Sequence, residues 1–227
     1  MTVTTRFDPQ LLTIHSYADE PTLSPALFSL DFLRHRFQRH IHWTPENTEE
    51  SNLFQGTEFK PASVLLPILL REQGLQVLLT QRAAHLHHHG GQISFPGGRV
   101  DATDTSAEHT ALREAEEEIG LLAQQVEILG RLPQYYTGTG FSVTPVVAVV
   151  HPPYDFSADP SEVASIFEVP LSFLMNPRHH QRRQIELPEG QGMRHFYAMP
   201  YQDYFIWGAT AGMLRNLFHF LRADVPE

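Results

Sequence analysis

Three glutamates near the middle of the chain have a spacing that suits metal binding. Glu114, Glu117 and Glu118 stand at positions i, i+3 and i+4, so on a helix their carboxylates share one face. Like charges this close destabilise a helix unless cations gather beside them. Oxygen ligands on a rigid element suit Mg²⁺ or Mn²⁺, which bridge to phosphates and lower the pKa of an attacking water. A run of glutamates can equally be a solvated helix face, so the flanking residues must decide.

The flanking residues favour the metal-site interpretation. A glycine pair, Gly97-Gly98, precedes the glutamates, and Arg113 stands directly before the first of them. The pattern predicts a helix over residues 106–119, which Gly120 is placed to end. Apolar residues on the adjoining helix face can bury it against a core: Leu112, Ala115 and Ile119.

The whole segment resembles the Nudix box, Gly-x5-Glu-x7-Arg-Glu-U-x-Glu-Glu-x-Gly-U, in which U is a bulky apolar residue. The positions that match are Gly98, Arg113, Glu114, Glu117, Glu118, Gly120 and Leu121. Asp104 takes the place of the first Glu, eight residues rather than seven separate it from Arg113, and Ala115 is small for U. Since the arginine of this box usually pairs with the first acid, we expect Arg113 to pair with Asp104.

A second stretch is similar to the signature of the coenzyme A pyrophosphatase branch, Leu-Leu-Thr-x-Arg-Ser/Ala-x3-Arg-x3-Gly-x3-Phe-Pro-Gly-Gly. Residues 78–98 match it at every fixed position except one, where His87 replaces the second Arg. The acidic pair Asp101 and Asp104 and the longer spacing also resemble this branch. The resemblance covers roughly residues 61–221.

The resemblance implies a fold, a reaction and a set of site residues. The fold would be α+β, an α/β/α sandwich around a Nudix-like mixed sheet. The reaction would be metal-dependent hydrolysis of coenzyme A or acyl-coenzyme A to 3′,5′-ADP and (acyl-)4′-phosphopantetheine. Glu114 and Glu118 would bind Mg²⁺ or Mn²⁺, with Glu117 as a further or water-mediated ligand and a backbone carbonyl at Gly98. The catalytic residues would be Glu114, Glu117, Arg113 and Glu162, the general base being Glu114 or Glu162.

Residues beside the box are candidates for substrate binding. Arg82 and Arg99 could hold phosphates through paired hydrogen bonds, and His87 and Gln92 belong to the same stretch. The histidines at 85 and 87–89 do not have an established zinc-ligand spacing, so we interpret them as a polar loop. A basic cluster downstream could meet the 3′-phosphate of coenzyme A, although a solvated loop is the simpler interpretation: Arg178, Arg182, Arg183 and Arg194.

The rest of the chain predicts the elements that position these groups. Residues 1–57 form an N-terminal extension with a helix predicted over 25–40, capped by Ser24, and residues 58–227 form the hydrolase domain. Apolar runs with turns between them predict strands over 63–70, 75–82, 126–132 and 142–150. Residues 163–173 are ambiguous between helix and loop, and residues 207–221 predict a terminal helix.

Composition limits the partners. With 16 Lys and Arg against 26 Asp and Glu, the net charge is −10, which argues against a general nucleic-acid or anionic-membrane binder. No apolar run reaches the ~20 residues of a membrane span, and the chain has no cysteine. We expect a cytoplasmic enzyme with a coenzyme A-like nucleotide substrate, and a homodimer is one option for its oligomeric state. The alternatives are another substrate (ADP-ribose, NADH or a nucleoside triphosphate) and a binding or regulatory module without turnover.

Overall fold

A mixed sheet forms the centre of the computed structural model, which describes residues 8–46, 58–86, 89–186 and 193–224. Five strands follow one another in the order β4-β3-β2-β8-β6, and β5, β7 and β9 pair with β2, β8 and β3. Their bounds are β2 Lys60–Arg71, β3 Gly74–Arg82, β4 Ile93–Ser94, β5 Gly97–Arg99, β6 Val126–Arg131, β7 Tyr135–Tyr136, β8 Phe141–Val150 and β9 Val163–Pro170. The predicted strands over 63–70, 75–82, 126–132 and 142–150 are confirmed, because each falls almost entirely within one of these.

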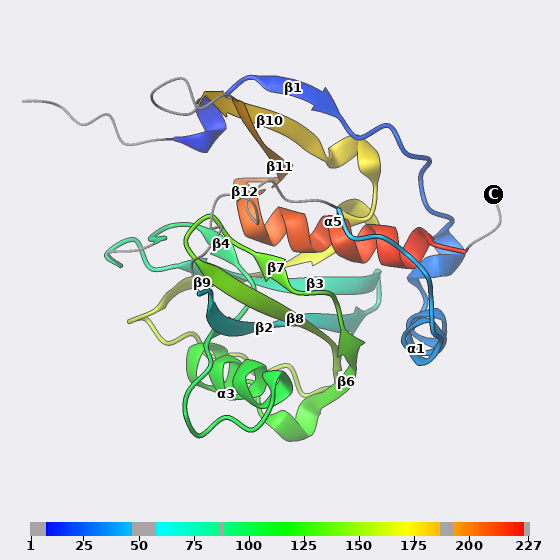
Figure 1. Cartoon of the computed structure of the whole chain (residues 1–227). Helices are drawn as coiled ribbons and strands as arrows, with labels where there is room; N and C mark the ends of the chain where they lie inside the picture. Colours follow the sequence, from blue (N-terminus) through cyan, green and yellow to red (C-terminus); the bar gives the residue numbers. More distant parts are fainter. Residues whose placement is uncertain (1–7, 47–57, 87–88, 187–192, 225–227) are drawn as a thin grey trace, which may run out of the picture.

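One helix covers each face of this sheet (Figure 1). The helix α3 (Ala107–Ile119) packs on one face, where Ala111, Ala115 and Ile119 join a buried cluster with residues of β2 and β8. The helix α5 (Gly208–Arg222) packs on the other face with the larger core cluster. β2 and β8 run parallel and pair continuously from Lys60 to Leu69. Because both faces of this pair are covered, the sequence of each strand is a long apolar run. The predicted α+β fold, with a sheet between helices, is confirmed.

A second sheet of four strands lies beyond α5 (Figure 1). Its order is β1-β10-β11-β12, with β1 Ile14–Tyr17, β10 Gln181–Glu186, β11 Met193–Tyr201 and β12 Tyr204–Trp207. All its pairs are antiparallel. The sequence pattern did not predict these strands. β1 comes from the N-terminal extension, so this part of the chain completes a sheet that the C-terminal part begins.

Two further predictions need correction. Residues 163–173, ambiguous between helix and loop in the sequence, form β9 and the short helix α4 (Leu171–Leu174), because β9 pairs along β3. The helix predicted over 25–40 is divided at Ser29 into a 3₁₀ helix, Pro25–Phe28, and α1, Leu30–Gln38. Ser24 caps the first piece as predicted, and the Ser29 hydroxyl accepts from the Phe32 N–H to cap the second.

The remaining short helices are 3₁₀ turns: η1 Pro9–Leu11, η3 Ala123–Gln125 and η4 Pro177–His179. Among the described residues, no helix is long and apolar enough to cross a membrane.

Candidate active site

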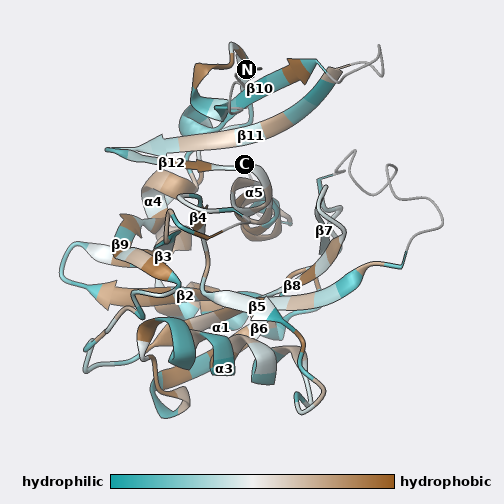
Figure 2. Cartoon of the chain, turned by 90° about the vertical axis from the view of Figure 1, so that its left-hand side faces the viewer, coloured by the Kyte–Doolittle hydropathy of each residue, from teal (hydrophilic) through white to brown (hydrophobic). Residues whose placement is uncertain are grey.

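The helix α3 holds the three glutamates of the sequence motif in a fixed register. Its N-cap is Ser106, whose hydroxyl accepts from the His109 N–H at 3.1 Å, and it ends at Gly120, which has the left-handed φ of 68° that favours glycine. The predicted helix over 106–119 is therefore confirmed. Its apolar face is fixed by the core, and Glu118 on the adjoining face meets the Gly97 N–H of β5 and the Arg82 guanidinium at the end of β3. Figure 2 shows α3 packed against the sheet close to β5.

The glycine pair lets the backbone of β5 lie directly against these carboxylates. A Cβ on Gly98 would lie 2.5 Å from the Glu114 carboxyl carbon, and one on Gly97 would lie 2.5 Å from the Ser63 carbonyl oxygen. No other residue fits at either position without a shift of the backbone or of the carboxylate. The Gly97 N–H donates to Glu118 Oε2 at 3.2 Å. The motif glycines are thus required by the closeness of strand and helix.

Arg113 and Asp104 form the ion pair expected from the box. Arg113 Nε and Nη2 donate to the two Asp104 oxygens at 3.1 and 2.9 Å, and this fork holds the pKa of the fully buried Asp104 well below its usual range. The same guanidinium lies 2.9 Å from Glu114 Oε1 and 3.1 Å from Glu117 Oε2. The expected pairing is confirmed, and the extra residue between Asp104 and Arg113 is accommodated.

Glu118 is a buried carboxylate with too little positive charge around it. Its side chain is 2% exposed, and burial raises its pKa to about 8, with the charges of Glu162 and Glu114 adding to the effect. Arg82 Nη1, 3.5 Å from Glu118 Oε1, and the Gly97 N–H offset only part of this. Burial also raises the pKa of Glu114. A buried carboxylate with a raised pKa is typical of a site that binds a metal ion or transfers a proton during catalysis.

Glu162 reaches this site from a later loop. The Asp159 N–H donates to the Glu118 carbonyl at 2.9 Å, which ties the loop to the end of α3, and the Ala83 N–H donates to the Glu162 carbonyl at 2.7 Å, which ties it to the end of β3. With the loop held in this way, the Glu162 carboxylate is close enough to raise the pKa of both Glu114 and Glu118. Glu114 therefore has three acidic side chains in its electrostatic surroundings: Glu117, Glu118 and Glu162.

These residues fit a divalent cation. Among the residues that the structure describes, no three acidic or histidine side chains already surround a common metal position, and Arg113 occupies oxygens of Glu114 and Glu117. Mg²⁺ commonly uses one or two carboxylates, several waters and the substrate phosphates rather than a complete protein cage. A cation here would supply the positive charge that the buried Glu118 lacks.

The predicted substrate-binding residues separate into two places. Arg82 lies at the carboxylates, and Arg99 is anchored beside them, since its carbonyl accepts from Arg113 Nη2 and its guanidinium lies over the Phe141 ring at 5.1 Å. Gln92 instead lines a cavity toward β12, where its Oε1 lies 2.8 Å from His89 Nδ1. His87 lies outside the described residues.

The interpretation of the downstream basic cluster needs correction at Arg183. Arg183 is neither in a solvated loop nor available to a phosphate. It lies on β10, is 7% exposed, and donates to the carbonyls of Gln10 and Leu12 at 2.8 Å. This burial could not be predicted from the sequence, because the carbonyls that Arg183 contacts lie more than 170 residues away along the chain.

The residues that sequence analysis missed lie on β12 and in the N-terminal segment. Together with Gln92 they line a cavity of about 410 Å³. None of the sequence motifs above pointed to them. The Thr210 hydroxyl donates to the Ile93 carbonyl at 2.9 Å and so holds β4 in place next to Gln92.

Comparison with known proteins agrees with this geometry. The family model for the NUDIX domain matches residues 60–187. The chain is 45% identical over 159 residues to a protein of Enterobacter sp. (strain 638) named "Uncharacterized Nudix hydrolase NudL", covering 70% of this chain and 81% of that one. It is 41% identical over 187 residues to a protein of the same name from Salmonella newport (strain SL254), covering 82% and 92%.

Among solved structures, a Nudix hydrolase from M. smegmatis, RenU, is 26% identical with a TM-score of 0.45, covering 61% of this chain and 85% of that one. Nudix hydrolases generally use divalent metal ions, which agrees with the acidic site on α3. The family match covers more than half of the chain and includes the glutamates, the glycine pair and the Arg113–Asp104 pair. The chain belongs to the Nudix family of hydrolases that act on pyrophosphate bonds.

Proposed function

We propose that this Nudix hydrolase cleaves the diphosphate of coenzyme A or an acyl-coenzyme A, giving 3′,5′-ADP and (acyl-)4′-phosphopantetheine, with Mg²⁺ or Mn²⁺. The observation that carries the reaction is the buried Glu118, which lies beside Glu114, Glu162 and Arg82 and lacks a full counter-charge. The coenzyme A assignment is supported by residues 78–98, which follow the signature of that branch. The described residues of this stretch form the second half of β3, β4 and the start of β5, and two of them, Arg82 and Gly97, contact Glu118.

In this proposal Glu118 and Glu114 hold the metal, with Glu117 and the Gly98 carbonyl completing the shell directly or through water. When bound, the metal polarises phosphoryl oxygens and lowers the pKa of an attacking water. Arg113 fixes the direction of the Glu114 carboxylate, because it is itself held by Asp104. Arg82 lies within reach of both Glu118 and the incoming phosphates, so it can transfer its contacts from the carboxylate to the substrate.

Glu162 is the residue that we propose as the general base. It is partly exposed and stands on a loop facing the two metal-binding glutamates. A carboxylate there can accept the proton of a water that attacks the diphosphate, provided that it lies within hydrogen-bond reach of that water. Glu114 is the alternative base, but its Oε1 lies 2.9 Å from Arg113 Nη1 and is therefore already engaged in an ion pair. A homodimer and a cytoplasmic location remain predictions from the sequence.

A substrate panel tests this proposal. The purified chain with Mg²⁺ or Mn²⁺ is given coenzyme A, acetyl-coenzyme A, dephospho-coenzyme A, ADP-ribose and NADH, and products are identified by mass. We expect the highest kcat/KM for a coenzyme A species, with 3′,5′-ADP as one product. If ADP-ribose were hydrolysed faster than every coenzyme A species, the substrate assignment would be refuted and the diphosphate chemistry would stand.

A further inference from the structure

The cavity that contains Gln92 lies close to the carboxylates but on the other face of β3. Adjacent strand residues point to opposite faces, so Arg82 reaches Glu118 while Gln81 lines the cavity. The Arg82 N–H also donates to the Gln92 carbonyl at 2.9 Å. The Gly91 N–H donates to the Arg82 carbonyl at 3.0 Å, so two residues of the cavity wall, Gly91 and Gln92, are hydrogen-bonded to the backbone of the residue proposed to contact the diphosphate.

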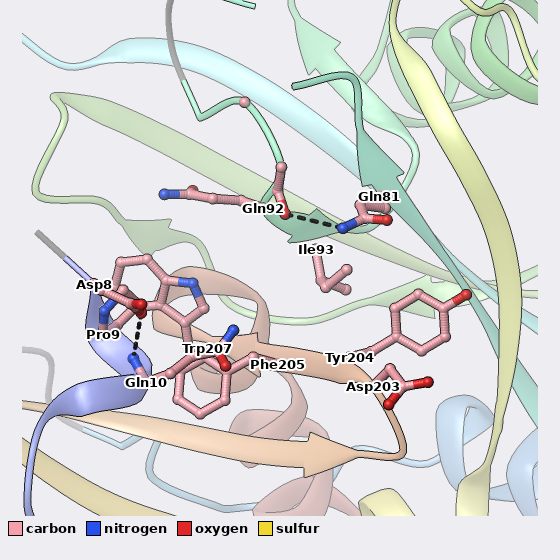
Figure 3. A pocket seen from close by; sticks show the side chains of 12 residues that line it. Asp8, Pro9, Gln10, Gln81, Gln92, Ile93, Asp203, Tyr204, Phe205 and Trp207 are labelled. Atoms are coloured by element: carbon pink, nitrogen blue, oxygen red, sulfur yellow. Dashed lines mark hydrogen bonds between the residues drawn. The ribbon is translucent and has the colours of Figure 1, made fainter. Parts of the chain in front are cut away.

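The walls of the cavity come from three separate parts of the chain (Figure 3). Gln81 and Gln92 stand on one side, and Tyr204, Phe205 and Trp207 of β12 stand on another. Residues 8–10 of the N-terminal segment close a third side. The cavity has a volume of about 410 Å³, within the ~300–1,000 Å³ typical of small-molecule sites.

The N-terminal wall is held in place by a buried charge. Arg183 donates through Nη1 to the carbonyls of Gln10 and Leu12, and through Nη2 to Gln181 Oε1 at 2.7 Å. Its guanidinium also lies over the Phe205 ring at 4.9 Å. One side chain therefore joins the N-terminal segment to the aromatic wall of the cavity.

The chemistry of the lining indicates what it binds. Among the described residues that line it, none is Arg, Lys or His, and two are the carboxylates Asp8 and Asp203. Such a lining disfavours a phosphate. Gln92 Oε1 is held by His89 Nδ1 at 2.8 Å, which leaves the Gln92 amide nitrogen to donate to a ring nitrogen of adenine. Aromatic side chains provide surfaces on which bases stack.

We propose that this cavity binds the adenine base of the nucleotide substrate, and that the N-terminal segment held by Arg183 is one of its walls. The assignment rests on the proposed function, because it places the flanking group of the same diphosphate. This assignment gives residues 8–10 a role in substrate selection. Gln92, expected from the sequence to contact substrate, would contact the base rather than the phosphates.

Tryptophan fluorescence tests the assignment directly. The chain has two tryptophans, and Trp43 packs near Phe220 with ring centroids 5.7 Å apart. The full-length variant Trp43→Phe leaves Trp207 as the sole reporter. With Mg²⁺ present, we expect 3′,5′-ADP to quench it, and 4′-phosphopantetheine and ribose 5-phosphate to leave it unchanged.

Two variants then test whether 3′,5′-ADP binds in this cavity. Gln92→Leu keeps the side-chain size and removes the amide, so the Kd of 3′,5′-ADP measured by calorimetry should rise about tenfold. Gln124→Leu, an exposed position on η3, is the matched control and should bind normally. With coenzyme A as substrate, Gln92→Leu should raise KM more than it lowers kcat, because the base is remote from the reacting bond.

The outcomes separate the two proposals. Quenching by 4′-phosphopantetheine and not by 3′,5′-ADP would overturn the adenine assignment, and so would an unchanged calorimetric Kd in Gln92→Leu. If coenzyme A is not hydrolysed but 3′,5′-ADP still quenches Trp207 and Gln92→Leu still weakens its binding, the substrate proposal fails and the adenine site stands.

Discussion

Arg113 holds Asp104 by two parallel hydrogen bonds of 3.1 and 2.9 Å, although eight residues separate the two in the sequence. The same guanidinium reaches Glu114 at 2.9 Å. A side chain that is fixed on one side by a buried carboxylate can position another carboxylate on its other side. The Arg113–Asp104 pair therefore fixes the geometry of the acidic site without itself having to contact the substrate.

The first prediction concerns this pair. Asp104→Asn keeps the size of the side chain and removes its charge, so Arg113 loses its strongest partner. Leaving a buried hydrogen-bonding group unsatisfied costs about 1–3 kcal/mol, and we expect a loss of this size in the free energy of unfolding from urea titrations. Since Glu114 is then less firmly positioned, kcat should fall as well. Glu58→Gln, at an exposed position, is the control. Full activity in Asp104→Asn would contradict a positioning role.

The second prediction concerns Glu118. Glu118→Gln removes a charged ligand and should lower kcat by ~10²-fold or more at saturating metal, as loss of transition-state charge stabilisation does in other enzymes. The matched control is Glu116→Gln, on the same helix but exposed, which should retain activity. A decrease of less than tenfold in Glu118→Gln would mean that the metal is held elsewhere.

The third prediction concerns removal of the metal. Chelation should abolish hydrolysis, and Mg²⁺ or Mn²⁺ should restore it, because the carboxylates around Glu114 need a counter-cation. Turnover that continues unchanged in excess chelator would rule out the metal-dependent mechanism.

The metal-free protein should also respond to pH through Glu118. Burial raises the pKa of this carboxyl to about 8 in the folded state, above its unfolded value near 4.5. The folded state then binds more protons, so stability is complete below about pH 4.5 and falls as pH rises towards 8. Thermal unfolding in chelator at pH 5–9 measures this. The loss should be smaller in Glu118→Gln, and a parallel decline in the two proteins would contradict the assignment.

The fourth prediction concerns the attachment of the N-terminal extension to α5. Arg215 is 2% exposed, and its Nε lies 2.8 Å from Glu46 Oε2. Burial favours the neutral form of Glu46, but hydrogen bonds from His219 and Arg215 outweigh it and lower its pKa to about 2.

Glu46→Gln should therefore destabilise the protein at pH 7 by about 1–3 kcal/mol, the cost of losing a hydrogen bond to a charged group, because Arg215 keeps its ion pair with Glu20. The stabilising effect of a depressed pKa is present above about pH 4.5 and is lost as pH falls towards 2. The difference between wild type and Glu46→Gln should shrink over that range in denaturant titrations. Asp31→Asn, at a side chain 87% exposed, should have little effect, and a pH-independent difference would argue against the ion pair.

The sequence by itself determined the elements whose information is local. The helix over 106–119 could be predicted because Ser106 caps it, Gly120 ends it and its apolar positions recur with helical period. The strands beside it could be predicted because they are continuous apolar runs between turns. The spacing of Glu114, Glu117 and Glu118 placed their carboxylates on one face before any tertiary information, and the motif around them indicated the reaction.

Only the tertiary structure decided which distant groups meet. Residues 163–170 become a strand because β3 supplies a partner. The strands β10–β12 could not be predicted from a clear period-two pattern, and they form a sheet together with β1 from the other end of the chain. Glu162 was a candidate from the sequence resemblance, but its approach to Glu114 and Glu118 depends on a loop that is tied to both α3 and β3. Arg183 is buried because it meets carbonyls of residues 9–12. Such contacts depend on backbone atoms far apart in the chain, and the side-chain pattern of one sequence carries no record of them.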